Sequence, residues 1–228
     1  MIKAIFMDID DTIFDFSLCV RGAFWEACAA AKITAAEETY QAFCRIDTAL
    51  WDMQKAGRLT VDDVVRVRAS RFTEAVNAST QAAAFQQAFQ RALSAQTVFV
   101  QNASSVIRSL SGRFPLYAAS NGMLDMQLSR LKSAELLLYF SDVFVSDEIG
   151  FEKPDGRFFT ECLNRVHFRP EEVLMVGDSL QSDIVGAAKT GLKSCWLNTA
   201  KRPNPSGMVP DYEIRELPEL LTLHMDDE

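Results

Sequence analysis

The amino-acid sequence predicts an α/β protein, in which a parallel sheet carries an inserted helical domain. Two observations predict this fold class. Short apolar runs alternate with helix-like segments over much of the chain, and a stretch of roughly eighty residues near the N-terminus has helical periodicity throughout. Parallel strands need long crossover connections, which are usually helices, so the alternation indicates a sheet flanked by helices.

The predicted strands are short apolar runs, most of which end at a polar residue. They span residues 2–7, 116–119, 143–145, 173–176 and 194–197, with a weaker last strand at 212–214 after a loop with three prolines. Helix-like segments near 123–134, 155–166 and 182–190 separate the later strands. In open parallel sheets, ligands bind at the carboxyl ends of the strands, so the polar residues at these ends are expected to form a site.

The helical stretch contains four amphipathic stripes and is too long for a single crossover connection. We therefore expect a four-helix inserted domain over residues 16–94, and a core made of residues 1–15 and 95–228. Thr34 with Glu37, and Thr60 with Asp63, have the spacing of helix N-terminal caps. The acidic end, residues 226–228, is expected to fray.

Composition excludes several classes of function. The chain has 228 residues, with 23 Lys plus Arg against 31 Asp plus Glu, and its formal charge of −8 disfavours a nucleic-acid polymer as partner. It has no run of 18 uncharged apolar residues, so no membrane partner is expected. Five scattered cysteines without a C-x-x-C pair favour reduced thiols and a cytoplasmic location. With two histidines, a histidine-rich metal site is also disfavoured.

The first strand ends in the sequence D-I-D-D-T, which places Asp8 and Asp10 two residues apart. Such a carboxylate pair suits a nucleophile beside a general acid–base, and its oxygens also suit a hard cation such as Mg²⁺. Taken alone, the pattern is more often an acidic turn or a helix cap.

Three further regions supply polar groups of the same kind. Ser120 and Asn121 follow the second strand, Lys153 precedes a proline after the third, and Asp178 and Asp183 follow the fourth. Separately, these residues would be an ordinary turn, a surface lysine and a capped helix. Together, four carboxylates against one lysine leave a formal charge of −3, which a divalent cation would reduce to −1. Phosphate could then be held by the metal, the lysine, the serine and backbone N–H groups, as phosphoryl transfer requires.

These four pieces, in this order, resemble the haloacid dehalogenase-like (HAD) hydrolase superfamily over essentially the whole chain. The match consists of D-x-D-x-T at residues 8–12, Ser120, Lys153 and G-D-x-x-x-x-D at residues 177–183. The resemblance implies a Rossmann-like core and makes the helical insertion a cap of the C1 type.

The resemblance also implies a role for each matching residue. Asp8 would be the nucleophile that forms an aspartyl-phosphate, and Asp10 the general acid–base. Mg²⁺ would be held by the Asp8 carboxylate, the Asp10 backbone carbonyl and Asp178. The other four residues would complete the site. Lys153, the third catalytic residue, and Ser120 would bind phosphate with help from Asn121, and Asp183 would orient waters or the lysine.

The reaction can be narrowed by comparison with branches of the superfamily. True dehalogenases lack the second carboxylate, which is present here as Asp10. Phosphonatases use a cap lysine as a Schiff base, and they are disfavoured because the cap has only Lys32 and Lys55 and position 10 is aspartate. Sugar phosphomutases carry a histidine-containing segment after the first motif, whereas residues 13–22 contain no histidine. A phosphomonoester hydrolase remains. The segments SDEIGFEKPDGRFF, LMVGDSLQSDIVGA and SCWLN resemble bacterial pyrimidine 5'-nucleotidases that act on dUMP, UMP and dTMP.

Two alternatives stay open at this point. The substrate could be another small phosphate monoester, such as a sugar phosphate, phosphoglycolate or an acylneuraminate phosphate. The protein could also be an inert scaffold or sensor with the same fold, although Asp8, Lys153 and Asp178 are all present. Specificity is expected to lie in the cap, where Trp51 and four arginines, among them Arg68, could reach a nucleotide but are not selected as site residues.

Overall fold

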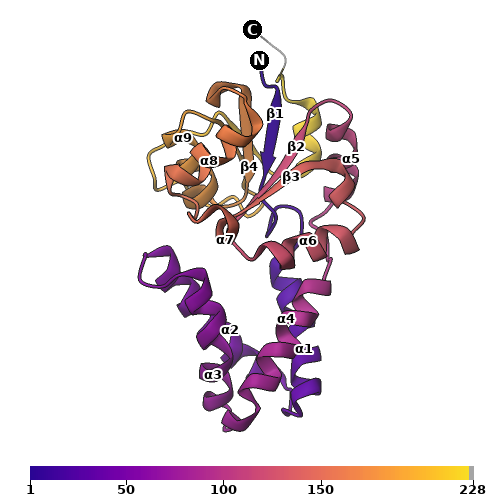
Figure 1. Cartoon of the computed structure of the whole chain (residues 1–228), viewed down its shortest axis with the longest axis vertical. Coiled ribbons are helices and arrows are strands. Elements are labelled where there is room, and N and C mark those ends of the chain that lie inside the picture. Colours follow the sequence, from indigo (N-terminus) through magenta and orange to yellow (C-terminus); the bar gives the residue numbers. More distant parts are fainter. Residues whose placement is uncertain (226–228) are drawn as a thin grey trace. The chain divides into compact units, whose positions relative to one another are not determined.

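The computed structural model describes residues 1–225, apart from the side chain of Lys55. The chain forms two compact units: residues 1–16 with the segment from Thr97 onward, and residues 17–96 (Figure 1). The helical unit begins one residue later, and ends two residues later, than the expected range of 16–94. Gln96 belongs with the helical unit because its side-chain amide donates a hydrogen bond to Glu26, at 2.8 Å. The acidic end, Asp226–Glu228, lies outside the described residues.

Within the described residues, six strands form one parallel sheet in the order β3-β2-β1-β4-β5-β6. The strands are β1 (Ala4–Met7), β2 (Leu116–Ser120), β3 (Phe140–Val145), β4 (Val173–Gly177), β5 (Lys193–Leu197) and β6 (Tyr212–Ile214). The predicted parallel α/β fold is therefore confirmed, including its weak last strand. Ile5 lies opposite Leu116 on one neighbouring strand and Leu174 on the other. The strand order reverses at β1, so its carboxyl end is the switch point at which such sheets bind ligands.

Helices cover the sheet because alternate strand residues point to opposite faces and both sets are apolar. One face packs Phe6, Val173 and Met175 against Phe158 and Phe159. The last two residues belong to α8 (Gly156–Val166), which lies beside α9 (Gly186–Lys189) in Figure 1, whereas α5 (Ala103–Ser111) lies on the opposite side of the sheet. The shorter α7 (Ser146–Ile149) directly follows β3, and α6 (Leu124–Ser133) follows β2.

Three of these elements differ from the sequence prediction. No helix was expected at the short α7 or at α5, whose inward face is a stripe of four apolar residues, Ala103, Val106, Ile107 and Leu110. The helix expected over 182–190 begins instead as a π-helical turn, Leu180–Val185, which then continues into α9. Wide turns of this kind occur often at functional sites.

The helical unit comprises α1 (Phe16–Ala31), α2 (Glu37–Lys55), α3 (Val61–Ala75) and α4 (Ala82–Ala95), joined to a short 3₁₀ turn at Ser79–Gln81. Its core is a cluster of phenylalanine rings, with Phe72 and Phe85 only 4.8 Å apart between ring centroids. Arg68 is buried beside this cluster, paired with Asp47 at 3.3 Å. Among residues 1–225, no helix is both long and apolar enough to cross a bilayer.

The two predicted helix caps have different outcomes. Thr60 caps α3 as predicted, since its hydroxyl accepts a hydrogen bond from the backbone N–H of Asp63, and the Asp63 carboxylate accepts one from the backbone N–H of Thr60. The prediction for Thr34 is wrong. The cap position of α2 is Ala36, whose backbone N–H donates to the Thr39 hydroxyl at 2.8 Å. Glu37 instead forms an ion pair with Arg21 on α1.

Candidate active site

Polar residues from three neighbouring strands meet at the carboxyl edge of the sheet. Asp8 directly follows β1, Ser120 ends β2, and Asp178 follows β4. The backbone supports this arrangement, because Asp8 N–H donates to Val176 O at 2.9 Å, and Asp178 N–H donates to the Thr12 hydroxyl at 3.1 Å. The strand order therefore brings together residues that are far apart in the sequence.

Lys153 is the buried cation of the site, with only 3% of its surface exposed. Its ammonium group donates three hydrogen bonds: to Asp8 Oδ1 at 2.6 Å, to Asp183 Oδ1 at 2.6 Å and to the Ala119 carbonyl at 2.7 Å. Because an ammonium has three N–H donors, this set saturates it and fixes its position between two carboxylates. Lys153 thus links two of the predicted carboxylates, Asp8 and Asp183.

The side chain of Asn121 forms two hydrogen bonds with the backbone of Lys153. Its Oδ1 accepts from Lys153 N–H, and its Nδ2 donates to the Lys153 carbonyl, both at 2.7 Å. Two hydrogen bonds from one side-chain amide to one residue restrain the backbone position of that residue. These contacts position the lysine, and the phosphate-binding role of Asn121 stays a prediction.

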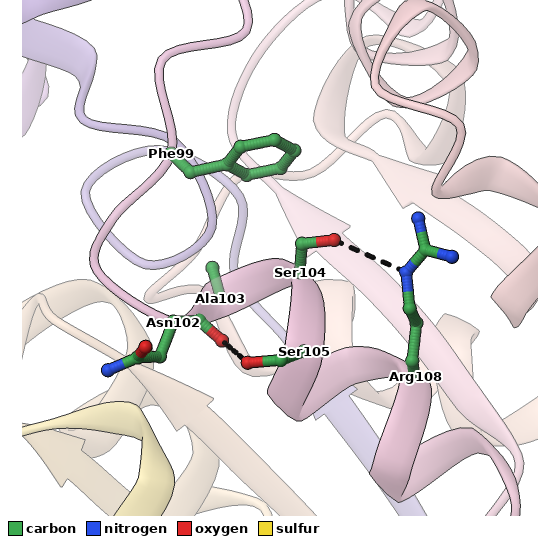
Figure 2. Close-up of a pocket in the computed structure, with 6 residues that line it drawn as sticks. All are labelled: Phe99, Asn102, Ala103, Ser104, Ser105 and Arg108. Atoms are coloured by element: carbon green, nitrogen blue, oxygen red, sulfur yellow. Dashed lines mark hydrogen bonds between the residues drawn. The ribbon is translucent and has the colours of Figure 1, made fainter.

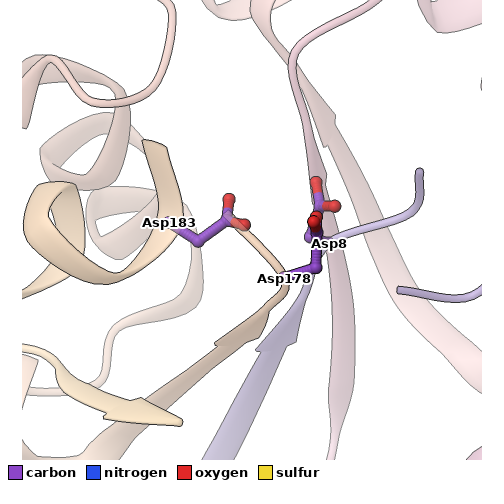
Figure 3. A group of neighbouring side chains, drawn as sticks. All are labelled: Asp8, Asp178 and Asp183. Atoms are coloured by element: carbon purple, nitrogen blue, oxygen red, sulfur yellow. The ribbon is translucent and has the colours of Figure 1, made fainter. Parts of the chain in front are cut away.

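Asp8, Asp178 and Asp183 form an acidic group in which one carboxylate oxygen from each lies within 4.8 Å of the others (Figure 3). Asp183 reaches the group from the π-helical turn, where its Oδ2 also accepts from Ser179 N–H at 3.0 Å. Gly177 makes room for it, since a Cβ at that position would lie 2.2 Å from Asp183 Oδ2. The glycine in the sequence G-D-x-x-x-x-D is thus needed for close approach of a side chain.

Burial makes this concentration of charge unfavourable. Burial raises the pKa of Asp8 well above its ordinary value, an effect that Lys153 opposes and that Asp183 and Asp178 reinforce. Burial and the Asp183 carboxylate also raise the pKa of Asp178 to about 6. Burial disfavours the charged form of Lys153 too, but the carboxylates of Asp183 and Asp8 outweigh it and raise the pKa of the lysine.

The donor set fits a divalent hard cation. Three carboxylates and one ammonium leave a formal charge of −2, which a divalent cation would neutralise, and Mg²⁺ prefers oxygen ligands of this kind. Such a cation would also favour the ionised form of Asp8, in opposition to burial. The chemistry of the residues therefore fits the magnesium that the sequence analysis expected.

Asp10 lies apart from this acidic group and contacts α6 instead. Its Oδ2 accepts a hydrogen bond from Gln127 Nε2 at 2.9 Å, and its Oδ1 accepts one from Arg130. The same Gln127 nitrogen donates to the Ser120 hydroxyl at 3.1 Å. About a quarter of the Asp10 side chain is exposed, so it remains accessible from solvent.

Sequence reasoning missed three residues that contact the predicted ones. Gln127 and Arg130 lie on α6, which has no recognisable motif. They could have been noticed because they lie three residues apart on the helix that follows β2, and therefore share a helix face. Arg202 lies in the proline-containing loop after β5, and its side chain, half exposed, donates to Asp178 Oδ2 at 3.0 Å. A long loop gives no periodicity from which such a contact could be predicted.

A separate pocket lies at the start of α5, lined by Phe99, Arg108 and the residues of the first helical turn (Figure 2). None of the predicted site residues lines it. Its arginine is already hydrogen-bonded to the Ser104 hydroxyl and to Tyr139. The chemistry described above therefore belongs to the sheet edge and not to this pocket.

The fold and this site define a hydrolase of the haloacid dehalogenase-like class. The family model for haloacid dehalogenase-like hydrolases matches residues 2–191, and the chain belongs to that family. The chain is 33% identical to the HAD-hydrolase YfnB of Bacillus subtilis (strain 168), over 96% of this chain and 93% of that protein. A crystal structure of YfnB bound to magnesium superposes with a TM-score of 0.90, covering 97% of each chain at 32% identity.

Two relatives with named substrates are similar over nearly their whole length. The pyrimidine 5'-nucleotidase PynA of Streptococcus pneumoniae (strain ATCC BAA-255 / R6) is 28% identical, over 96% of this chain and 93% of that one. The pyrimidine 5'-nucleotidase YjjG of Escherichia coli (strain K12) is 29% identical, over 95% of each. These matches extend through the helical unit as well as the sheet.

Proposed function

We propose that this protein is a Mg²⁺-dependent phosphomonoester hydrolase that acts through an aspartyl-phosphate on Asp8, with pyrimidine nucleoside monophosphates such as dUMP, UMP and dTMP as substrates. The observation that carries the proposal is the Lys153 ammonium, buried between Asp8 and Asp183 beside Asp178. A buried ammonium and a hard-cation site around one strand-end carboxylate provide the charge that a phosphoryl group needs.

In the first half-reaction, an oxygen of Asp8 attacks phosphorus while the bond from phosphorus to the ester oxygen breaks. Asp10 gives its proton to the departing oxygen, so the alcohol leaves neutral. Lys153, whose ammonium exchanges its hydrogen bond to Asp8 Oδ1 for one to the substrate, and the Ser120 hydroxyl donate to the phosphoryl oxygens. The bound Mg²⁺ would be held by Asp8, Asp178 and the Asp10 carbonyl, and it supplies positive charge that offsets the charge of the phosphoryl group.

In the second half-reaction, Asp10 takes a proton from a water molecule whose oxygen attacks phosphorus. The bond between phosphorus and Asp8 then breaks, which releases inorganic phosphate and restores both carboxyl groups to their starting protonation states. Asp183, which accepts hydrogen bonds from Lys153 and from Ser179 N–H, keeps the ammonium in place through both steps.

The substrate assignment is supported by the two nucleotidase relatives, which are similar to this chain over the helical unit as well as the core. In this assignment the helical unit is the cap, and it selects the leaving group. The phosphate chemistry does not depend on that selection, since every residue assigned to it lies in the sheet unit.

A phosphatase screen with Mg²⁺ present tests the proposal. We expect kcat/KM for dUMP, UMP and dTMP to exceed that for purine nucleotides, sugar phosphates and phosphoglycolate, and a chelator to abolish all activity. A preference for sugar phosphates would contradict the nucleotidase assignment and leave the chemistry intact. An absence of hydrolysis on every substrate, with or without Mg²⁺, would favour an inert scaffold and contradict the whole proposal.

A further inference from the structure

Two buried polar side chains on α6 contact Asp10, and no step described above uses them. Gln127 is 1% exposed and Arg130 is fully buried. They lie three residues apart and therefore on the same face of the helix. Each donates to a different oxygen of Asp10, so both oxygens of this carboxylate are engaged by α6.

Burying a guanidinium is costly unless its surroundings compensate for lost water. Here the compensation is specific. The Arg130 guanidinium contacts Asp10 and Gln127 Oε1, the latter at 3.1 Å, and lies over the Phe14 ring at 4.6 Å from its centroid. An apolar residue would fill this position on the helix at less cost, so the arrangement indicates a function for the charge and its hydrogen bonds.

The amide of Gln127 also connects two groups that act in the proposed mechanism. Its Nε2 donates to Asp10 Oδ2 at 2.9 Å and to the Ser120 hydroxyl at 3.1 Å. One nitrogen thus sets the spacing between the general acid–base and a phosphate-binding hydroxyl. Asp10 follows β1 and Ser120 ends β2, and α6 fixes them relative to each other.

We propose that Gln127 and Arg130 are positioning residues that hold the Asp10 carboxyl group within reach of the leaving oxygen. This inference rests on the proposed function. An aspartate side chain that is partly exposed can take several staggered rotamers, and two donors on a rigid helix select one of them. Proton transfer requires the acid and the leaving oxygen to be about 2.6–3.2 Å apart, so a freely rotating Asp10 would protonate the leaving group poorly.

The inference predicts for which substrates kcat/KM falls when the α6 contacts with Asp10 are lost. An ester whose alcohol leaves readily as an anion needs no proton from Asp10, whereas an ester of a weakly acidic alcohol does. The parameter to measure is kcat/KM, because it reports steps up to the first irreversible one, in which the leaving group departs. The probes are p-nitrophenyl phosphate, phenyl phosphate and an alkyl phosphate, all with Mg²⁺.

For Arg130→Met, we expect kcat/KM on p-nitrophenyl phosphate to stay within about threefold of wild type, because that step needs no general acid. On the alkyl phosphate we expect a fall of about 30-fold or more, within the range that a positioned general acid contributes. Arg130→Lys keeps a charged donor and should lie between wild type and Arg130→Met. Gln127→Met also removes the donor to the phosphate-binding Ser120 hydroxyl, so we expect its kcat/KM to fall on every ester, and by a larger factor on the alkyl phosphate than on p-nitrophenyl phosphate. Gln127→Met leaves the ion pair between Arg130 and Asp10 in place. It provides the test of the inference if Arg130→Met does not fold.

Arg68→Met is the matched control. Arg68 is also a buried arginine, it pairs with one aspartate, and its guanidinium lies 4.4 Å from the centroid of the Phe89 ring. Its replacement should lower thermal stability and leave the ratio of alkyl to p-nitrophenyl kcat/KM unchanged.

Two results would overturn the inference, and they can be told apart. If Arg130→Met and Gln127→Met lower kcat/KM by the same factor on all three esters, the α6 residues are only structural and the proposed function stands. If the wild-type protein hydrolyses neither these esters nor dUMP, UMP and dTMP, the proposed function fails and the inference fails with it.

Discussion

At the residue scale, side chains that belong to no sequence motif contact the side chains of the motif residues. Asp8, Lys153 and Asp178 were selected from the sequence because four motifs occur together, in one order, after successive predicted strands. Gln127 and Arg202 were not, because their contacts depend on a helix face and a loop path that the sequence pattern does not define. Asn121 was selected from the sequence as a phosphate ligand, and the structure adds two hydrogen bonds from its amide group to the Lys153 backbone, which the sequence did not predict.

Gly177→Ala is the residue-scale test of how the acidic group is packed. The added Cβ would clash with Asp183 Oδ2, so we expect Asp183 to be displaced and the free energy of unfolding to fall by about 1–3 kcal/mol. Because Asp183 also holds Lys153, kcat should fall as well. Thermal unfolding and steady-state kinetics with Mg²⁺ measure these two effects.

Gly112→Ala provides the control for that variant. Gly112 ends α5 with φ near −77°, and a Cβ there would meet its nearest neighbour, the Ser109 carbonyl, at an ordinary 3.7 Å. Its stability should stay within about 0.5 kcal/mol of wild type or rise slightly. Equal destabilisation by the two substitutions would show that the space at Gly177 has no special role.

At the element scale, periodicity predicted the strands better than it predicted helix ends. All six strands were identified because buried parallel strands are short and continuously apolar. The start of a helix depends on one or two side chains, so it is harder to predict than a strand. Thr60 and Thr34 lie in similar sequences, yet Thr60 caps α3 and Thr34 lies before the start of α2. The helix α5 was missed because its apolar stripe is too short to stand out.

The paired substitutions Thr60→Ala and Thr34→Ala test this difference. Thr60→Ala removes the acceptor for Asp63 N–H, and we expect a loss of about 1 kcal/mol in the free energy of unfolding. Thr34→Ala should change it by less than about 0.5 kcal/mol. Chemical denaturation of both variants measures this directly, and an equal loss from Thr34→Ala would contradict the assignment of Ala36 as the cap position of α2.

At the scale of the whole molecule, the chain divides into a sheet unit that holds every proposed catalytic residue and a helical unit with its own phenylalanine core. The order of the motifs was enough to predict the sheet unit and the chemistry at its edge, because topology places strand ends together. The helical unit was predicted as an insertion, but its sequence gives no motif for the leaving group. Arg68, which could have reached a nucleotide on sequence grounds, is buried and paired with Asp47.

The central claim is that Asp8 becomes phosphorylated during turnover. The most direct measurement is an acid quench of the Mg²⁺-loaded protein during hydrolysis of a phosphate-labelled ester, followed by location of the label in a peptide. We predict covalent label on the peptide that contains Asp8, no label in Asp8→Asn, and a fall in turnover of at least about a thousandfold in that variant. Appreciable turnover by Asp8→Asn, or label on another residue, would contradict the account.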